Sequence, residues 1–331
     1  MRRLSIITTL YNSARYLPKC LDSLLNQDIP ESDYEVIIVN DGSPDNSKEI
    51  ALRYASTHKN IKIISQENKG LAGARNTGIR AAEGKFLYFV DPDDYILENS
   101  LGRILQKMDD DSLDVLRFGY SEVDEMYRPT SSVKHFIEPD YSPGIMDGYT
   151  FMSERLGVAC YVWTYLFRSS LIKDNEVFFI EGQYFDDTPW LPRVLSKAKR
   201  VDSIAYKRHF YLIRKDSLVQ SRDDRSINNK IDGELLLIRE MTRQRDLTDN
   251  ENGKKWYEMM IAHCTLSLLS YFSRFNYAER KKYAKLLDHQ LVFPLSLYRA
   301  NGRNSFKIRL ANFSPNLFLA FLKFSSLINK V

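Results

Sequence analysis

The chain has 331 residues and a net charge of +4, and 44% of its residues are hydrophobic, 27% charged and 12% aromatic. This composition excludes a collagenous, low-complexity or wholly disordered chain, and the length predicts one large domain or two smaller ones. The positive charge lies at the C-terminal end, because residues 271–331 carry 11 Lys and Arg against 2 Asp and Glu, whereas residues 1–220 carry 28 against 32.

Short apolar runs alternate with helical segments over residues 1–100. The runs are rich in β-branched and aromatic residues, which predicts strands at 4–10, 34–40, 61–65 and 85–90. Helical spacing between them predicts a first helix that carries Leu17, Leu21, Leu24 and Leu25 and is capped at its start by Ser13, and further helices at 47–58 and 71–83. The alternation predicts an α/β fold with a doubly wound, mostly parallel sheet, in which ligands bind at the carboxyl ends of the strands.

The pattern changes after residue 100 and again near residue 220. Strands are predicted at 113–120 and 201–206, helices at 148–156 and 188–197, and a loop-rich stretch at 124–144. From residue 227 onward the pattern is almost entirely helical, and helices are predicted at 228–244, 253–275, 277–291 and 315–329. We therefore expect an α/β domain over residues 1–220 and a mainly helical C-terminal region over residues 221–331.

Polar residues follow each of the first four predicted strands. These segments are 8–12, 40–43, 66–70 and 91–94. Taken singly, each is typical of a turn or a helix cap. Together at one edge of one sheet, they predict a binding site.

The segment Asp91-Pro92-Asp93-Asp94 places carboxylates directly after a buried strand. Carboxylates this close repel one another unless a cation lies among them, and oxygen-only ligands favour Mg²⁺ or Mn²⁺ over zinc. The alternative is a solvated acidic turn in which an aspartate caps the following helix. A second acidic run, at 109–111, follows a predicted helix and is expected to be a solvated surface turn.

Small residues surround Arg75 in the segment 70–76, where the third strand gives way to a helix. Small side chains let a ligand approach the backbone, a helix N-terminus favours anions, and Arg75 adds a fixed charge. A close contact between helix and sheet explains the small residues equally well. The segment matches neither a dinucleotide-binding nor a Walker pattern.

Asp186 and Asp187 form a second acidic focus, just before Pro189. One interpretation is that either aspartate caps the helix that Pro189 begins. The other is that one of them is a general base, a carboxylate that takes a proton from an attacking hydroxyl.

The segments TTLYN, VNDGS, GLAGARNTGI, FVDPDD and FDDT together resemble the family 2 glycosyltransferases, which are inverting, nucleotide-sugar-dependent enzymes of the GT-A fold. The resemblance covers roughly residues 4–220. It implies a catalytic domain over 1–220, with a nucleotide-binding half at 1–100 and an acceptor half at 101–220.

The resemblance also implies a role for each matching residue. The implied nucleotide-binding residues are Thr9, Tyr11, Asn12, Asp41, Gly42, Arg75, Asp91 and Asp93. Asp91, Asp93 and Asp94 would form the DXD element, with Asp93 and Asp94 binding Mn²⁺ or Mg²⁺. Asp187 corresponds to the catalytic base, but the family's preceding Glu is Asp186 here, so either aspartate could face the acceptor.

Arg214 and Trp163 extend the resemblance beyond the acidic motifs. Arg214 is the implied contact of the leaving diphosphate, and a surface salt bridge is the alternative. Trp163 and Phe167 resemble the family's aromatic segment on the acceptor side, and burial in the core is the alternative.

The expected reaction moves a hexosyl or N-acetylhexosaminyl group from a nucleotide-diphosphate donor, most simply a UDP-sugar, to a hydroxyl of a saccharide or lipid-linked saccharide. Bacterial surface polysaccharide synthesis is the implied pathway. The alternatives are a metal-dependent nucleotidyltransferase and a nucleotide-sugar-binding protein without turnover. No helix-turn-helix, RNP or zinc pattern accompanies the basic tail, so nucleic acid is not an expected partner.

The sequence predicts a cytoplasmic protein. Cys20, Cys160 and Cys264 form no C-x-x-C pair, which favours a reducing compartment. The N-terminus has no small-residue cleavage site, and no run reaches the roughly 18 apolar residues of a membrane span. Basic and aromatic residues interleaved over 271–331 nevertheless predict peripheral binding to an anionic membrane surface, the inner face of the cytoplasmic membrane. The alternative is that these aromatic residues pack the helical region.

Overall fold

The computed structural model describes residues 2–130, 144–214, 224–272, 294–300 and 302–314, together with residues 317, 318, 320 and 321. The chain divides into two compact units, Met1–Ser217 and Leu218–Val331. The helix expected at 277–291 lies outside the described residues, as does most of the helix expected at 315–329.

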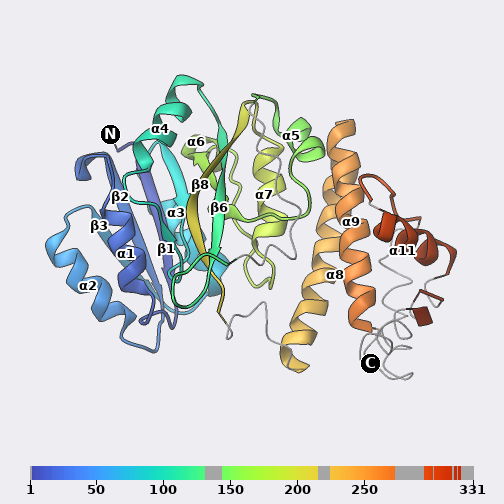
Figure 1. Ribbon diagram of the computed structural model, residues 1–331, viewed down its shortest axis with the longest axis horizontal. Coiled ribbons are helices and arrows are strands. Elements are labelled where there is room, and N and C mark those ends of the chain that lie inside the picture. The colour runs from blue at the N-terminus through green and yellow to red at the C-terminus, as the bar shows by residue number, and fades with distance from the viewer. Residues whose placement is uncertain are drawn as a thin grey trace. The chain divides into compact units, whose positions relative to one another are not determined.

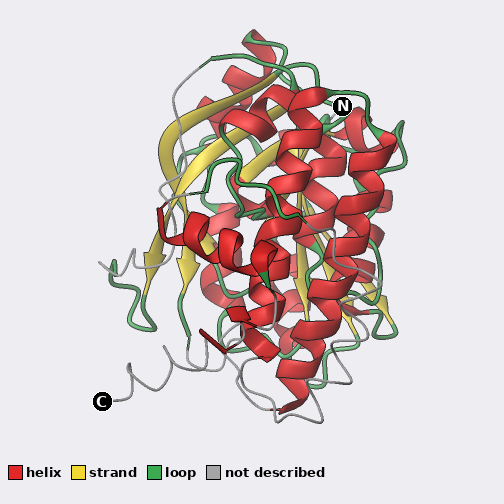
Figure 2. Ribbon diagram, turned by 90° about the vertical axis from the view of Figure 1, so that its right-hand side faces the viewer, coloured by secondary structure: helices red, strands yellow, loops and turns green. Residues whose placement is uncertain are grey.

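In the described residues, the strands of the first unit form one eight-stranded sheet in the order β3-β2-β1-β4-β7-β6-β8-β5. Figure 2 shows these strands in yellow. Their bounds are β1 Leu4–Leu10, β2 Tyr34–Asp41, β3 Ile61–Gln66, β4 Phe86–Phe89, β5 Tyr95–Ile96, β6 Val115–Val123, β7 Tyr165–Arg168 and β8 Val201–Leu212. The first four strands are parallel, and β7 runs antiparallel to both β4 and β6. The sheet is therefore mixed, and its N-terminal half has the predicted parallel topology.

The central strands of this half are buried on both faces. Every residue of β1 and of β2 is buried. Parallel sheets covered by helices on both sides require such continuous apolar runs, and the segments LSIITTL and YEVIIVN supply them.

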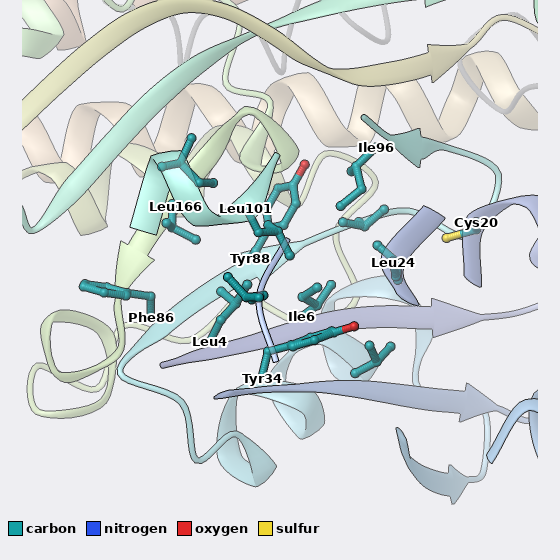
Figure 3. Packing of buried hydrophobic residues seen from close by; sticks show 14 of the residues in the cluster. Leu4, Ile6, Cys20, Leu24, Tyr34, Phe86, Tyr88, Ile96, Leu101 and Leu166 are labelled. Atoms are coloured by element: carbon teal, nitrogen blue, oxygen red, sulfur yellow. The ribbon is translucent and has the colours of Figure 1, made fainter. Parts of the chain in front are cut away.

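Helices α1 (Leu17–Leu25), α2 (Ser47–Thr57) and α4 (Leu101–Asp110) contribute to a core on one face of the sheet. In α1, Leu17, Leu21 and Leu24 recur at helical spacing and are all fully buried. Figure 3 shows Leu24 of this helix with Leu4 and Tyr88 of the strands in the same cluster.

Helix α3 (Gly70–Ala81) contacts β1 and β2. Helix α7 (Asp187–Leu195) carries Trp190, whose ring stacks on that of Phe179 with 4.2 Å between the ring centroids. Gly78 permits the close approach of α3, because a Cβ at this position would lie 2.4 Å from Cγ2 of Ile7 on β1. Gly78 lies outside the segment 70–76, and within that segment a Cβ would meet no strand: nothing lies within 4 Å of Gly70, and the nearest atom to Gly73 is Cβ of Lys69 at 2.5 Å. Shorter helices in this unit are α5 (Gly148–Glu154) and α6 (Ser169–Lys173).

The prediction that Ser13 caps α1 is wrong. The helix begins at Leu17, and its N-cap residue is Tyr16, with no side-chain capping bond. Ser13 instead accepts the backbone N–H groups of Tyr16 and Leu17 through its carbonyl oxygen, at 3.0 Å each. The chain makes one turn before the helix, and this turn displaces Ser13 from the cap.

The described part of the second unit contains α8 (Asp224–Leu247), α9 (Glu251–Phe272) and α11 (Gly302–Phe313). Helices α8 and α9 pack side by side, with Ile238 and Leu268 fully buried (Figure 1). Helix α11 was not among the predicted helices. None of the described helices combines the length and the apolarity that a bilayer crossing needs.

Candidate active site

The predicted polar strand ends meet at one edge of the sheet. The backbone N–H of Asn12, just after β1, donates to Oγ of Ser43 after β2 at 2.8 Å. Oδ1 of Asp41 at the end of β2 accepts from Nε2 of Gln66 at the end of β3, at 2.7 Å. Parallel strands in register place their carboxyl ends together, so the structure brings together the segments that the sequence singled out.

Asp41 is 3% exposed, and its Oδ1 also accepts the backbone N–H of Lys69 at 2.9 Å. Two donors on one oxygen fix the carboxylate and leave Oδ2 as the atom able to accept from a ligand. Thr9 is also nearly buried, whereas Tyr11 is 56% exposed. An exposed aromatic ring at this edge can stack on a planar base.

The turns that follow β1 and β2 each contain a residue in the left-handed backbone conformation, with a positive φ. Asn12 has a φ of 55° and Gly42 a φ of 67°. A Cβ at Gly42 would also lie 3.2 Å from the backbone nitrogen of Asn68, so a side chain here would be strained and crowded. Asn12 and Gly42 therefore shape the edge through their backbone.

Arg75 joins three carboxylates from two distant parts of the chain. Its Nη2 lies 2.9 Å from Oδ1 of Asp91, and its Nη1 lies 2.7 Å from Oδ2 of Asp186 and also contacts Oδ1 of Asp187. Arg75 is 2% exposed. Burial opposes its charge, but the carboxylates of Asp187, Asp186 and Asp91 outweigh burial and raise the pKa of Arg75.

Neither Asp186 nor Asp187 caps a helix through its side chain. Helix α7 begins at Asp187, its N-cap residue is Asp186, and no side-chain capping bond is present. Oδ2 of Asp187 accepts only a long bond in the described residues, from the backbone N–H of Val162 at 3.3 Å. Burial raises the pKa of Asp187 to about 7; Arg75 opposes this increase, and Asp186 adds to it. A carboxylate with this pKa can take up a proton near neutral pH.

Asp93 pairs with Arg214 just beyond β8, Oδ2 to Nε, at 2.8 Å. The guanidinium of Arg214 also lies over the ring of Tyr16, 5.4 Å from its centroid. Burial, then Asp94 and Asp91, raise the pKa of Asp93 to about 7, whereas Arg214 lowers it. Arg214 thus lies beside the acidic turn, and residues 215–223, which follow it, lie outside the described part of the chain.

Asp94 lies in the same turn as Asp91 and Asp93, but its side chain is buried. Asp94 is 1% exposed, and its oxygens bond Nε2 of His209 and the backbone N–H of Leu212, each at 2.9 Å. Burial holds its pKa well above the usual range. These contacts argue against the expected metal role of Asp94 and make it a link between the acidic turn and β8. The turn is not the solvated loop of the alternative interpretation.

His209 is a residue that the sequence analysis missed. It is fully buried, and its Nδ1 lies 2.9 Å from the hydroxyl of Tyr88 on β4. Burial lowers its pKa to about 3. His209 therefore ties β8 to β4 and, through Asp94, to the turn that carries Asp93. No sequence signal could identify this role, because the partners of a lone histidine in a strand are more than a hundred residues away.

Trp163 lies within a stack of rings. It is 4% exposed, and its ring stacks on those of Tyr161, Tyr211 and His209 at centroid distances of 5.0, 5.3 and 4.6 Å. Phe167 is fully buried. The alternative interpretation as core therefore accounts for both residues. Trp163 still lies next to Val162, whose N–H reaches Asp187, so the stack adjoins the candidate base.

The oxygen donors at this edge suit a hard divalent cation. Asp91 and Asp93 keep 25% and 18% of their side chains exposed, and carboxylate oxygens are the ligands that Mg²⁺ and Mn²⁺ prefer. Within the described ranges, no group of three or more His, Cys, Asp or Glu side chains is arranged to hold a metal. A cation here would therefore depend on two carboxylates and on oxygens of its ligand.

The mixed sheet, with acidic residues gathered at the carboxyl edge of its parallel half, has the GT-A fold. The profile described as Glycosyl transferase family 2 matches residues 5–172, which is half of the chain. The chain belongs to this family.

Among its relatives is the uncharacterized glycosyltransferase EpsJ of Bacillus subtilis, which is 34% identical over 223 residues. The match covers 65% of this chain and 62% of EpsJ, so the chain spans less than two thirds of the length of that relative.

Solved structures share the fold. A crystal structure of residues 1–349 of Staphylococcus aureus TarS in complex with UDP-GlcNAc matches with a TM-score of 0.72 at 20% identity, covering 97% of this chain and 89% of that chain. TarS is a poly(ribitol-phosphate) beta-N-acetylglucosaminyltransferase. The mannosyltransferase PcManGT of Pyrobaculum calidifontis, in complex with GDP-Man and Mn²⁺, matches with a TM-score of 0.55 at 15% identity, covering 98% of this chain and 88% of that chain.

Proposed function

We propose that the protein is an inverting glycosyltransferase that moves a hexosyl or N-acetylhexosaminyl group from a nucleotide-diphosphate sugar to an acceptor hydroxyl. The observation that carries the proposal is the pairing of Arg75 with Asp91 on one side and with Asp186 and Asp187 on the other. A residue of the acidic turn and a candidate base therefore lie within reach of one guanidinium. We assign the catalytic domain to residues 1–220.

Asp187 is the proposed base. Its Oδ1 is held by Arg75, and Oδ2 is the atom that would take the proton from the acceptor hydroxyl. Deprotonation as the new bond forms lets the hydroxyl attack the anomeric carbon from the face opposite the departing diphosphate. This single displacement inverts the configuration at that carbon.

Arg75 is proposed to orient carboxylates rather than to bind phosphate. Both of its Nη atoms are occupied by Asp91, Asp186 and Asp187, and only 3% of its side chain is exposed. This occupancy argues against the expected phosphate contact of Arg75. Arg214, with 27% of its side chain exposed beside Asp93, is better placed to meet the leaving diphosphate.

Asp91 and Asp93 are the proposed holders of Mn²⁺ or Mg²⁺. Such a cation would supply positive charge to the diphosphate as the sugar leaves. Thr9, Tyr11, Asn12, Asp41 and Gly42 are the proposed binding residues for the nucleoside, and the exposed ring of Tyr11 and the fixed carboxylate of Asp41 support this.

A UDP-sugar is the proposed donor, because the TarS structure with the same fold holds UDP-GlcNAc. The proposed acceptor is a saccharide or lipid-linked saccharide of bacterial surface polysaccharide synthesis. We place the reaction in the cytoplasm, on the inner face of the cytoplasmic membrane, where lipid-linked acceptors would be reached.

A screen of UDP- and GDP-sugars tests this function. In the presence of Mn²⁺, we expect slow hydrolysis of one sugar nucleotide, with release of the nucleoside diphosphate measured by a coupled assay. Release of pyrophosphate from a sugar phosphate and a nucleoside triphosphate would instead identify a nucleotidyltransferase. Tight binding of a sugar nucleotide without any turnover, with or without candidate acceptors, would make the protein a binding module.

Replacing Asp93 by alanine is expected to remove the effect of Mn²⁺ on UDP binding, measured by calorimetry with and without the metal. Asp94→Ala should leave that effect and lower the urea midpoint instead, because His209 and the N–H of Leu212 would lose a buried partner, at a cost of about 1–3 kcal/mol. Asp110→Ala, at an exposed position on α4, is the control. Unchanged metal dependence in Asp93→Ala would remove Asp93 from the proposed metal site.

A further inference from the structure

Helix α11 and the segments next to it expose large apolar side chains. Phe313 is 82% exposed and Phe306 is 53% exposed. Leu297, Leu317 and Phe321 are 42%, 47% and 36% exposed. These five residues are here called the α11 surface. Soluble proteins rarely leave several large apolar side chains of one region open to water, and where they do, the region is commonly an interaction site.

The α11 surface is built from segments that contact one another. The rings of Phe306 and Phe321 meet edge to face, 5.4 Å apart. The backbone N–H of Leu295 donates to the side chain of Asn312 at 2.6 Å, and that side chain donates back to the carbonyl of Leu295 at 3.0 Å. This pair holds the segment that carries Leu297 against α11, so the exposed residues belong to one region.

The opposite side of the same helix is packed. Ile308 is 4% exposed, Ala311 is fully buried, and Phe318 just beyond the helix is 1% exposed. The alternative interpretation of the tail aromatic residues as core therefore explains Phe318, but not Phe306 or Phe313. Helix α11 has an inner face that anchors it and an outer face that exposes apolar side chains.

The stretch of sequence that carries the α11 surface has charge of one sign. Residues 289–331 contain six Lys and Arg and no Asp or Glu. Lys307 and Arg309 lie on α11 itself, and Arg309 is exposed. An apolar surface bordered by cations matches an anionic bilayer, in which apolar side chains enter the interfacial region and cations meet lipid phosphates. A second copy of the chain would bring like charges together and fits less well.

We propose that the α11 surface binds an anionic lipid bilayer peripherally. Phe306, Phe313 and Leu317 would insert at the boundary between headgroups and acyl chains. Lys307 and Arg309 would contact the phosphates of anionic lipids. The proposal uses no residue of the catalytic site, so it holds or fails independently of the proposed reaction.

Vesicle flotation of the full chain tests the proposal. We expect the protein to float with vesicles of phosphatidylcholine mixed with phosphatidylglycerol, and to float much less with phosphatidylcholine alone or at high salt. Phe313→Ser combined with Leu317→Ser should reduce flotation to the level seen with phosphatidylcholine alone. Leu52→Ser is the matched control, because Leu52 on α2 is 49% exposed but lies in the first unit.

Further measurements distinguish loss of membrane binding from misfolding and from self-association. Circular dichroism and vesicle-free hydrolysis of the sugar nucleotide should be unchanged in the double variant, which would exclude misfolding as the cause of lost flotation. Lys307→Glu combined with Arg309→Glu should reduce binding to anionic vesicles selectively. Flotation of the double serine variant at the wild-type level would overturn the proposal. A wild-type dimer that this variant dissociates, with no flotation of either protein, would make the surface a self-interface instead.

Discussion

Replacing Asp187 by asparagine is expected to abolish sugar transfer, lowering kcat by about 10²–10⁴-fold, while nucleotide binding is retained. Asparagine has nearly the same shape, and its amide oxygen can still accept the bond from Arg75, whereas the amide nitrogen at the place of Oδ2 gives up only the long bond from the N–H of Val162. It cannot take up a proton at neutral pH, so only the chemical step is affected. Single-turnover transfer and UDP calorimetry measure the two effects separately.

Asp186→Asn distinguishes the two adjacent acids. If Asp187 is the base, this variant should retain most of kcat, because Asp186 is 8% exposed and its Oδ2 is directed to Arg75. Asp110→Asn is the control for the loss of a carboxylate elsewhere. A large loss in Asp186→Asn with near-normal turnover in Asp187→Asn would exchange the assignments.

The pH dependence of wild-type kcat gives a second readout of the same assignment. Burial raises the pKa of Asp187 to about 7 against the effect of Arg75, and Asp186 and Asp91 add to the increase. The base acts in its unprotonated form, so kcat should rise with pH through about 7 and level off above it. A profile that falls with rising pH over this range would contradict the role of base.

Replacing Arg75 by alanine is expected to lower the free energy of unfolding by about 3–5 kcal/mol, because it breaks buried ion pairs by removing one partner. Asp91, Asp186 and Asp187 would then face one another without a cation. The urea midpoint, followed by circular dichroism, measures the effect. Arg75→Lys keeps the charge but lacks the planar fork, so it should fold and lose part of its activity.

Arg80→Ala is the matched control for Arg75. Arg80 lies on the same helix, is exposed, and its guanidinium lies 4.7 Å from the centroid of the Phe178 ring. Its removal should change stability by no more than about 0.5 kcal/mol. Equal urea midpoints for Arg75→Ala and Arg80→Ala would show that the buried carboxylates do not need the cation.

The parallel half of the sheet could be predicted because the signals for its strands and helices lie within short segments of the sequence. The apolar runs that form β1 to β4 and the helical spacing between them occur within residues 1–100, and the connections follow from chain order. β5, a strand of two residues, and β7, a strand of four, have no comparable signal and depend on partners such as β8 and β4. Helix α11 was missed because its charged and polar residues obscure its apolar spacing.

Some site residues could likewise be placed from local sequence signals, whereas others depend on partners that are remote in sequence. Asp91 and Asp93 could be placed at the edge of the sheet because they directly follow a predicted strand. The position of Asp94 could not, because its burial depends on His209 and Leu212, which are 115 and 118 residues away in sequence. The partners of Arg75 are similarly remote, because Asp186 lies 111 positions further along the chain. Sequence identifies which side chains carry charge, but their partners depend on tertiary packing.

Gly78 has a bearing on catalysis although it touches no substrate. It lies one turn beyond Arg75 on the same helix, at the point where α3 presses against Ile7. Because no side chain intervenes, α3 packs closely on β1, and this spacing bears on where Arg75 meets Asp91 and Asp186. Even a methyl group at position 78 would lift the helix and alter the reach of Arg75 without changing any acid. The precision with which Arg75 is placed thus depends on a close helix–strand contact in the core, at a residue that has no side chain.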